Sequence, residues 1–192
     1  MDLLSQNVVK YISLSQEERE LFLSYFIEKN LKKKEYLLRE GEINKGTAFV
    51  TDGLLRSYSV DKNGFEHVIQ FAPTGWWIGD MYSAIKQKPA RLFIDALENT
   101  EFLFLYNSDM EMLYKKIPAL ERLFRILAQN AMISYQARLI NFLSLPAKER
   151  YRNFCEQYPS LTECLPQKQV ASYIGVTPEF LSKMLSELKS EK

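Results

Sequence analysis

Residues 167–189 read QKQVASYIGVTPEFLSKMLSELK, and this stretch decides what kind of fold the chain ends in. Apolar residues at helical spacing predict one helix over 167–174 and a second over 178–189. Between them, Gly175 suits a turn residue with positive φ, Thr177 is a good N-cap and Pro178 fits the first helical position. Two short helices joined by such a turn are the pattern of a helix-turn-helix.

The two predicted helices have one buried and one outer face. The buried face of the second helix is predicted to consist of Phe180, Leu181, Met184, Leu185 and Leu188. The outer residues of both helices, which a helix-turn-helix offers to DNA, are Gln167, Lys168, Thr177, Pro178, Glu179, Ser182, Lys183 and Ser186. In that arrangement Lys183 reaches guanine or a phosphate, Glu179 accepts from cytosine, and the first helix crosses the backbone. An ordinary helical hairpin has the same spacing, so this alternative stays open.

Strand-length apolar segments alternate with turn signals between about Glu35 and Tyr106. The dipeptides Asp52-Gly53 and Asn63-Gly64 are strong hairpin signals, and turns at roughly ten-residue intervals predict an antiparallel sandwich or barrel. The first thirty residues are predicted to be helical, with Ser15 and Glu18 at capping-box spacing.

Pro118 is expected to open a long helix that runs to about Leu143. Its apolar residues form two stripes, one of Leu120, Phe124, Leu127 and Ala131, the other of Leu123, Ile126, Ile133, Ala137 and Ile140. A helix that is apolar on two faces needs two partners. The β region and the same helix of a second subunit would serve, and burial inside one monomer is the alternative. Residues 144–147 are expected to break this helix and cap the next, over 147–158.

Composition excludes several classes of protein. The chain has 192 residues, enough for one large or two small domains, and a formal net charge of +1, which excludes a polybasic nucleic-acid coat. Two cysteines, Cys155 and Cys164, cannot make a four-cysteine zinc or iron–sulfur site, and His67 is the only histidine. The polar start and the absence of a long apolar run predict a soluble, cytoplasmic protein with reduced thiols and no membrane segment.

Over nearly its whole length the chain resembles the Crp/Fnr family of bacterial transcription regulators. The resemblance rests on residues 36–42 (YLLREGE), 49–56 (FVTDGLLR), 75–80 (GWWIGD) and, most specifically, 169–183. It implies an α+β chain with a β-roll sensor domain over 1–117, a long dimerisation helix and hinge over 118–145, and a DNA-binding domain over 146–192. The partners implied are double-stranded DNA read by a homodimer, with RNA polymerase as a further one.

Two departures from the family pattern change these expectations. Nucleotide-binding members pair Gly-Glu with an Arg followed by Ser or Thr, whereas this chain has Gly79-Asp80 with Met81 next to it, and Arg91 followed by Leu92. The Thr-Ser pair that reads adenine aligns with Ile133 and Ser134. We therefore expect an effector other than cyclic AMP, or none, at a site of Gly79, Asp80, Met81, Arg91, Leu92 and Ser134. The family's β-hairpin wing would come after Leu188, where the sequence leaves four residues, so we expect no wing.

Other family sensors find little support in the residue types. His67 is expected to be a structural strand residue rather than a haem ligand, and Cys155 and Cys164 are expected to be buried thiols rather than a redox pair. Trp76, Trp77 and Tyr82 are interpreted as a core corner, with a ligand pocket as the alternative. A metal enzyme on a cupin-like roll would need several histidines, so we expect no metal and no enzymatic activity. A sensor or protein-interaction module that does not bind DNA is the remaining alternative.

Overall fold

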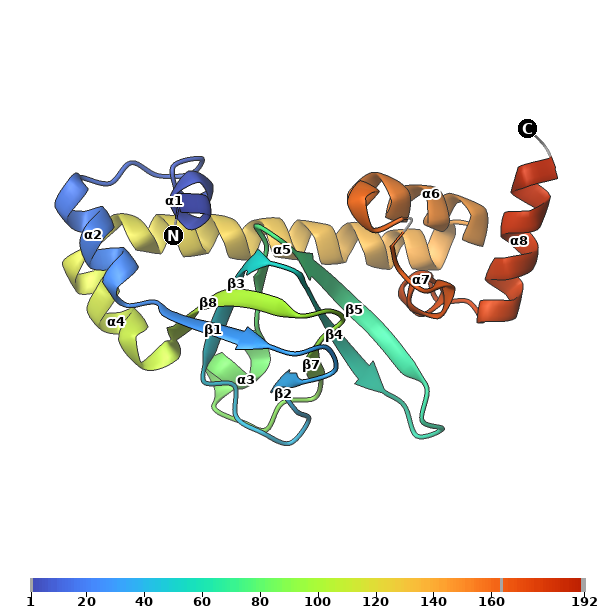
Figure 1. Cartoon of the computed structure of the whole chain (residues 1–192), viewed down its shortest axis with the longest axis horizontal. Coiled ribbons are helices and arrows are strands. Elements are labelled where there is room, and N and C mark those ends of the chain that lie inside the picture. The colour runs from blue at the N-terminus through green and yellow to red at the C-terminus, as the bar shows by residue number, and fades with distance from the viewer. Residues whose placement is uncertain (1, 163, 191–192) are drawn as a thin grey trace. The chain divides into compact units, whose positions relative to one another are not determined.

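The computed structural model of the chain describes residues 2–162 and 164–190. In order, its elements are α1 (Asp2–Val8), α2 (Gln16–Ser24), β1 (Ile27–Leu31), β2 (Tyr36–Leu38), β3 (Gly46–Asp52), β4 (Leu54–Val60), β5 (Glu66–Pro73), β6 (Trp77–Ile78), α3 (Met81–Lys86), β7 (Phe93–Ala96), β8 (Thr100–Tyr106), α4 (Asn107–Lys116), α5 (Ala119–Ser144), α6 (Ala147–Gln157), the 3₁₀ turn η1 (Pro159–Leu161), α7 (Gln167–Ile174) and α8 (Pro178–Ser190) (Figure 1). The expectation that no wing is present concerns the chain beyond α8, which lies outside the described residues.

The strands form a β-roll of two four-stranded sheets. The strand order is β1-β8-β3-β6 in one sheet and β2-β7-β4-β5 in the other, with antiparallel pairing of β8 to β1 and β3, and of β7 to β2 and β4. A layer of buried side chains lies between them, including Leu55, Ile94 and Phe102. The predicted α+β class with an antiparallel roll, a long helix and a helical end is confirmed.

Contacts divide the chain into two compact units that are interleaved in sequence. The first contains residues 1–59 and 69–129, and the second contains 60–68 and 130–192. In the first unit, α1, α2, α4 and the start of α5 share a core with the roll that includes Phe22, Phe49, Leu113 and Leu120. The three-part division at residues 117 and 145 concerns function, and it stays a prediction.

Local signals predicted the helix boundaries well. Ser15 accepts from the backbone N–H of Glu18 at 3.1 Å, and the Glu18 carboxylate accepts from the backbone N–H of Ser15 at 2.8 Å, which is the predicted capping box. Pro118 directly precedes α5, as expected. Ser144 does not cap α6, because its hydroxyl donates to the carbonyl of Ile140, at 2.6 Å, and Pro146 occupies the N-cap position.

Two predictions about the β region were wrong. The first thirty residues were predicted to be helical, but residues 27–31 form the strand β1. This strand is held by pairing with β8, which lies far along the chain. Asp52-Gly53 is not a hairpin turn, because β3 and β4 lie in different sheets. Gly53 is needed there for close approach: a Cβ atom would lie 2.6 Å from the carbonyl oxygen of Asn99. Asn63-Gly64 does join neighbouring strands, β4 and β5.

Candidate DNA interface and sensor region

The turn between α7 and α8 has the geometry that its residue types dictate. Gly175 adopts a left-handed conformation, with φ of 72° and ψ of 47°, and the N–H of Val176 donates to the carbonyl of Ala171 at 3.0 Å. The hydroxyl of Thr177 then accepts from the N–H of Phe180 at 3.2 Å, which caps α8. The chain therefore closes one helix and opens the next within three residues, as predicted for a helix-turn-helix.

The packing of α6, α7 and α8 against one another determines which faces of α7 and α8 are exposed. Ala171 and Leu181 are fully buried where α7 meets α8, and Phe154 of α6 is buried beside them. The rings of Phe154, Tyr158 and Tyr173 lie 5.4–5.6 Å apart, so α6 and η1 support α7 from the other side. Aromatic pairs of this kind stabilise the packing by more than the area they bury.

All the residues predicted to face DNA are exposed. They are Gln167, Lys168, Thr177, Pro178, Glu179, Ser182, Lys183 and Ser186. Phe180, which the spacing placed in the buried face, is 52% exposed, and this prediction was wrong. Leu181 and Met184 of α8 are buried, whereas the Phe180 ring in its first turn lies outside.

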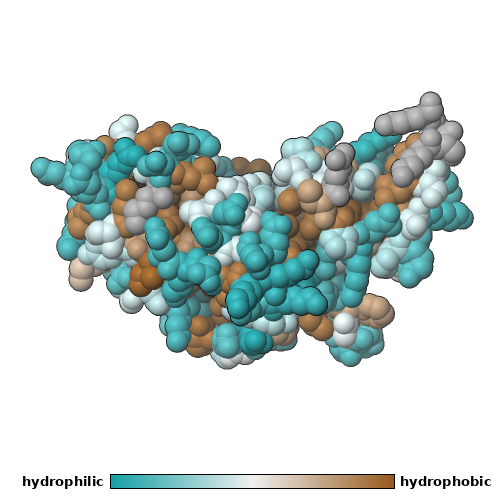
Figure 2. All heavy atoms as spheres, in the orientation of Figure 1, coloured by the Kyte–Doolittle hydropathy of each residue, from teal (hydrophilic) through white to brown (hydrophobic). Residues whose placement is uncertain are grey.

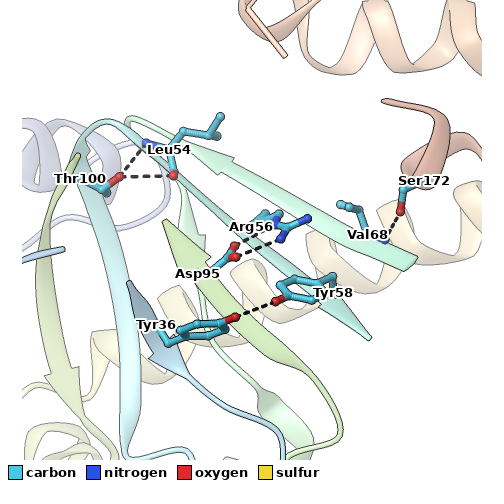
Figure 3. A network of polar contacts seen from close by, with 8 residues as sticks. All are labelled: Tyr36, Leu54, Arg56, Tyr58, Val68, Asp95, Thr100 and Ser172. Carbon is cyan, nitrogen blue, oxygen red and sulfur yellow. Dashed lines mark hydrogen bonds and ion pairs between the residues drawn. The ribbon is translucent and has the colours of Figure 1, made fainter. Parts of the chain in front are cut away.

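A hairpin segment packs on the helices of the second unit. The hydroxyl of Ser172 in α7 donates to the carbonyl of Glu66 at 2.7 Å. It also accepts from the N–H of Val68 at 2.9 Å (Figure 3). From α5, Nη2 of Arg138 donates to the carbonyls of Val68 and Tyr173, both at 2.7 Å. Burial lowers the pKa of Arg138. Sequence reasoning missed these contacts because they join residues 35 to 106 positions apart.

Two predicted effector residues of the roll, Asp80 and Arg91, make contacts within the roll. Asp80 is buried and caps α3, with Oδ1 accepting from the N–H of Ser83 at 3.1 Å. Arg91 is exposed, donates to the hydroxyl of Tyr82 at 3.2 Å and lies over its ring. Next to these two, Gly79 packs against Thr47, Met81 is exposed and Leu92 is half-buried.

The remaining predicted effector residue, Ser134, belongs to the second unit. Its hydroxyl accepts from Nε2 of Gln157 at 3.3 Å. The neighbouring Ile133 is exposed. Trp77 is part of a core corner, as predicted, because its ring contacts Phe26, Phe49 and Phe124.

A charged pair inside the roll was not anticipated from the sequence. Arg56 and Asp95 are both buried and form a two-pronged contact, with Nε to Oδ1 at 2.8 Å and Nη2 to Oδ2 at 3.0 Å. The guanidinium lies 4.0 Å from the ring centre of Tyr58, whose hydroxyl is 3.5 Å from that of Tyr36. Figure 3 shows the network between the strands. Burial is the main cause that raises the pKa of Tyr58. An arginine between Leu55 and Ser57 in a predicted strand was the signal available.

The other reactive residues lie outside these sites. His67 is exposed and contacts Asp61 at 3.1 Å, consistent with a structural role in the hairpin. Cys155 is half-buried and Cys164 is exposed, so the expectation that both are buried was wrong for Cys164. Within residues 2–162 and 164–190, no cluster of three potential metal ligands occurs. No helix in the same described ranges is both long and apolar enough to span a membrane.

Comparison with known proteins places this fold. Residues 28–116 match the family model of the cyclic nucleotide-binding domain. FixK2 from Bradyrhizobium japonicum superposes with a TM-score of 0.76 at 20% identity, covering 86% of this chain and 85% of that chain. The c-di-GMP responsive global regulator CLP from Xanthomonas campestris gives 0.73 at 13% identity, with coverage of 92% and 93%.

A transcriptional regulator of the Crp/Fnr family from Eubacterium rectale gives a TM-score of 0.72 at 14% identity, with coverage of 93% and 85%. No curated protein sequence matches the chain significantly. The chain thus has the fold of the Crp/Fnr regulators.

Proposed function

We propose that this chain, which carries a cyclic nucleotide-binding domain within the Crp/Fnr fold, is a homodimeric transcription regulator that binds DNA sequence-specifically. The observation that carries the proposal is the turn between α7 and α8. Gly175 and Thr177 form the turn between the two helices, and the polar residues expected to face DNA are exposed on both.

The exposed residues supply the chemistry that DNA recognition needs. A recognition helix over about 178–189 places its first turns at base edges, where Glu179 accepts a hydrogen bond and Lys183 donates one. Ser182 and Ser186 add hydroxyl groups that donate or accept. Gln167 and Lys168 begin α7, where they suit phosphate oxygens. Figure 2 shows hydrophilic surface interrupted by apolar patches, in keeping with a net charge of +1, so affinity would come from arrangement and from two copies.

The second copy would bind along the exposed apolar face of α5. Met132 and Leu139, and likewise Ile133 and Ile140, lie seven residues apart, and Leu143 continues the same face. Met132 is 70% and Leu143 is 75% exposed. Earlier in α5, Leu120, Phe124 and Leu127 already pack into the core of the first unit. Paired α5 helices would carry two recognition helices to major grooves ~34 Å apart on a near-palindromic site.

The sensor region supports an effector other than cyclic AMP. Asp80 is used as a helix cap and Arg91 stacks on Tyr82, while Leu92 supplies no hydroxyl group. We propose the division into a sensor over 1–117, a dimerisation helix and hinge over 118–145 and a DNA-binding domain over 146–192, with Gly79, Asp80, Met81, Arg91, Leu92 and Ser134 as effector residues. RNA polymerase is the further partner proposed.

Fluorescence anisotropy on duplexes from upstream of the protein's own gene tests the proposal. The titration is run at two salt concentrations, with and without cyclic AMP, against scrambled DNA. We expect selective binding without nucleotide, weakened about tenfold by Lys183→Ala, since a base contact is worth about 1–3 kcal/mol. Lys88→Ala, at an exposed lysine of the first unit, is the control and should change nothing.

Other outcomes of this titration are also informative. Equal affinity and equal sequence preference of Lys183→Ala and the unsubstituted protein would rule out α8 as the recognition helix. Binding only with cyclic AMP would overturn the reading of Asp80 and Leu92. A dimer that shows no sequence preference would favour the alternative of a sensor or protein-interaction module.

A further inference from the structure

A small pocket with both apolar and polar lining residues lies inside the second compact unit, among α5, α6 and α7. It measures about 100 Å³, and its lining consists of Ser134, Ala137, Arg138, Asn141, Phe142, Arg150, Asn153, Phe154, Gln157, Tyr173 and Ile174. Pockets for drug-sized ligands measure ~300–1,000 Å³, so a nucleotide is too large for it. The space suits a group of a few non-hydrogen atoms.

The described lining of this pocket contains two positively charged side chains and no negatively charged one. The two positively charged residues are Arg138 and Arg150. The acidic residues of α6, Glu149 and Glu156, are exposed and do not line the pocket. Because a partly buried cation is stabilised by a counter-charge, a pocket of this composition favours an anion.

Arg150 supplies the most specific signal. Its Nη1 donates to the carbonyls of Phe142 and Leu145, both at 3.3 Å, which fixes the guanidinium at the end of α5. Its Nε is buried and has no hydrogen-bond partner in the described part of the chain. Buried N–H donors are rarely left unpaired in native proteins, so a small shift of the guanidinium toward the pocket would give Nε an acceptor that is not part of this chain.

Neutral donors complete the lining. The side-chain amides of Asn141 and Asn153 make no hydrogen bond within the described residues, and Gln157 bridges Ser134 and Tyr173 at the pocket wall. Guanidinium and amide N–H groups together match the oxygens of a carboxylate or a phosphate.

A second copy of the chain would not fill the pocket. The lining residues of α5 are 134, 137, 138, 141 and 142, of which Phe142 is 54% exposed, whereas the exposed apolar residues 132, 133, 139, 140 and 143 do not line the pocket. At 100° per residue, the two sets lie on opposite faces of the helix. A dimer along the apolar face therefore leaves this pocket accessible.

We infer that this pocket binds a small oxyanion, a phosphate or a carboxylate group, between Arg138 and Arg150 where the long helix meets the helix-turn-helix. The inference goes beyond DNA binding and does not depend on it. Since the anion would contact α5, α6 and α7 at once, it would stabilise one arrangement of these three helices.

The test uses the whole chain in Tris-chloride buffer with inorganic phosphate or acetate as probes, and with sodium chloride at matched ionic strength as the blank. We expect one probe to raise Tm saturably, by roughly 3–6 °C at ten times its Kd. It should also shift the Arg150 Nε–H resonance in a ¹H–¹⁵N spectrum. Arg150→Gln should abolish the saturable rise, and Arg152→Gln, at an exposed arginine two residues along α6, should keep it.

Each outcome decides between possibilities. A response to acetate but not to phosphate identifies a carboxylate ligand, and the converse identifies a phosphate; both support the site. A rise in Tm that only tracks ionic strength, or that is equal in both variants, overturns it. An Arg150 Nε–H resonance that neither probe moves overturns it as well, and this readout on the unsubstituted protein needs no variant to fold.

Discussion

At the scale of single residues, Arg56 and Asp95 form a buried pair of charges in the β2-β7-β4-β5 sheet. Two charges removed from water are stabilised only when their geometry is good and their remaining polar atoms are paired. The two-pronged contact and the Tyr58 ring over the guanidinium meet that condition. The pair fixes the register of β4 against β7, since Arg56 and Asp95 are also strand partners.

Removal of one member of this pair should be costly. Asp95→Ala leaves the Arg56 guanidinium buried without its counter-charge, and we expect a loss of about 3–5 kcal/mol in the free energy of unfolding. The double substitution Arg56→Met with Asp95→Leu should recover most of that loss. Urea denaturation measures both, and a double variant no more stable than the single one would contradict this explanation.

Gly175 is constrained both by its positive φ and by the nearby ring of Phe142, whereas Gly64 is constrained by its positive φ alone. Gly175 and Gly64 both have positive φ, but a Cβ atom at Gly175 would collide with the ring of Phe142, while at Gly64 it would meet open space. Gly64→Ala should therefore cost only the backbone strain, about 1–2 kcal/mol, and Gly175→Ala more. The difference should shrink when Phe142 is also replaced by alanine. Thermal unfolding of both glycine variants, each with and without Phe142→Ala, and of the two parent proteins gives the comparison. Equal losses for both glycines would exclude a steric role of Phe142.

At the scale of elements, α5 changes its surroundings along its length. Its first turns are buried in the core of the first unit, whereas its second half exposes large apolar side chains. Exposed apolar residues in register along one helix face indicate a binding surface rather than scattered surface hydrophobics.

A charge on that face should separate the copies. We expect Leu139→Glu to convert a dimer to a monomer, because it places like charges opposite each other in an apolar seam. Asn130→Glu adds the same charge to the same helix away from the face and should leave the dimer intact. Sedimentation equilibrium distinguishes the two, and a Leu139→Glu protein that remains dimeric would move the interface elsewhere.

Elements whose ends depend on neighbouring residues could be predicted from the sequence. Ser15 with Glu18, Pro118 before α5, and Gly175 with Thr177 all act within four positions, and these predictions are confirmed. β1 could not be predicted, because its partner β8 lies about seventy residues later. The contacts of Ser172 and the pairing of Arg56 with Asp95 were hidden for the same reason.

At the scale of the whole molecule, the chain passes from the first unit to the second at residues 60–68, returns, and passes over again within α5. Neither unit is one continuous segment, since the chain crosses between them three times. A ligand changes DNA binding only to the extent that it binds one helix arrangement more tightly than another.

The interleaving of the units also sets an order of events on the ribosome. Val68 is synthesised 70 residues before Arg138 and 104 residues before Ser172, the two side chains that bond its carbonyl and its N–H. At a synthesis rate of about 5–20 residues per second, Ser172 is added roughly 5–20 s after Val68. The backbone of Val68 lacks this partner during that time. An unfinished strand edge is a template for pairing with other chains. Chains truncated before residue 172 lack Ser172, so the backbone N–H of Val68 in β5 never gains this partner. We expect these truncated chains to be the ones that aggregate during synthesis.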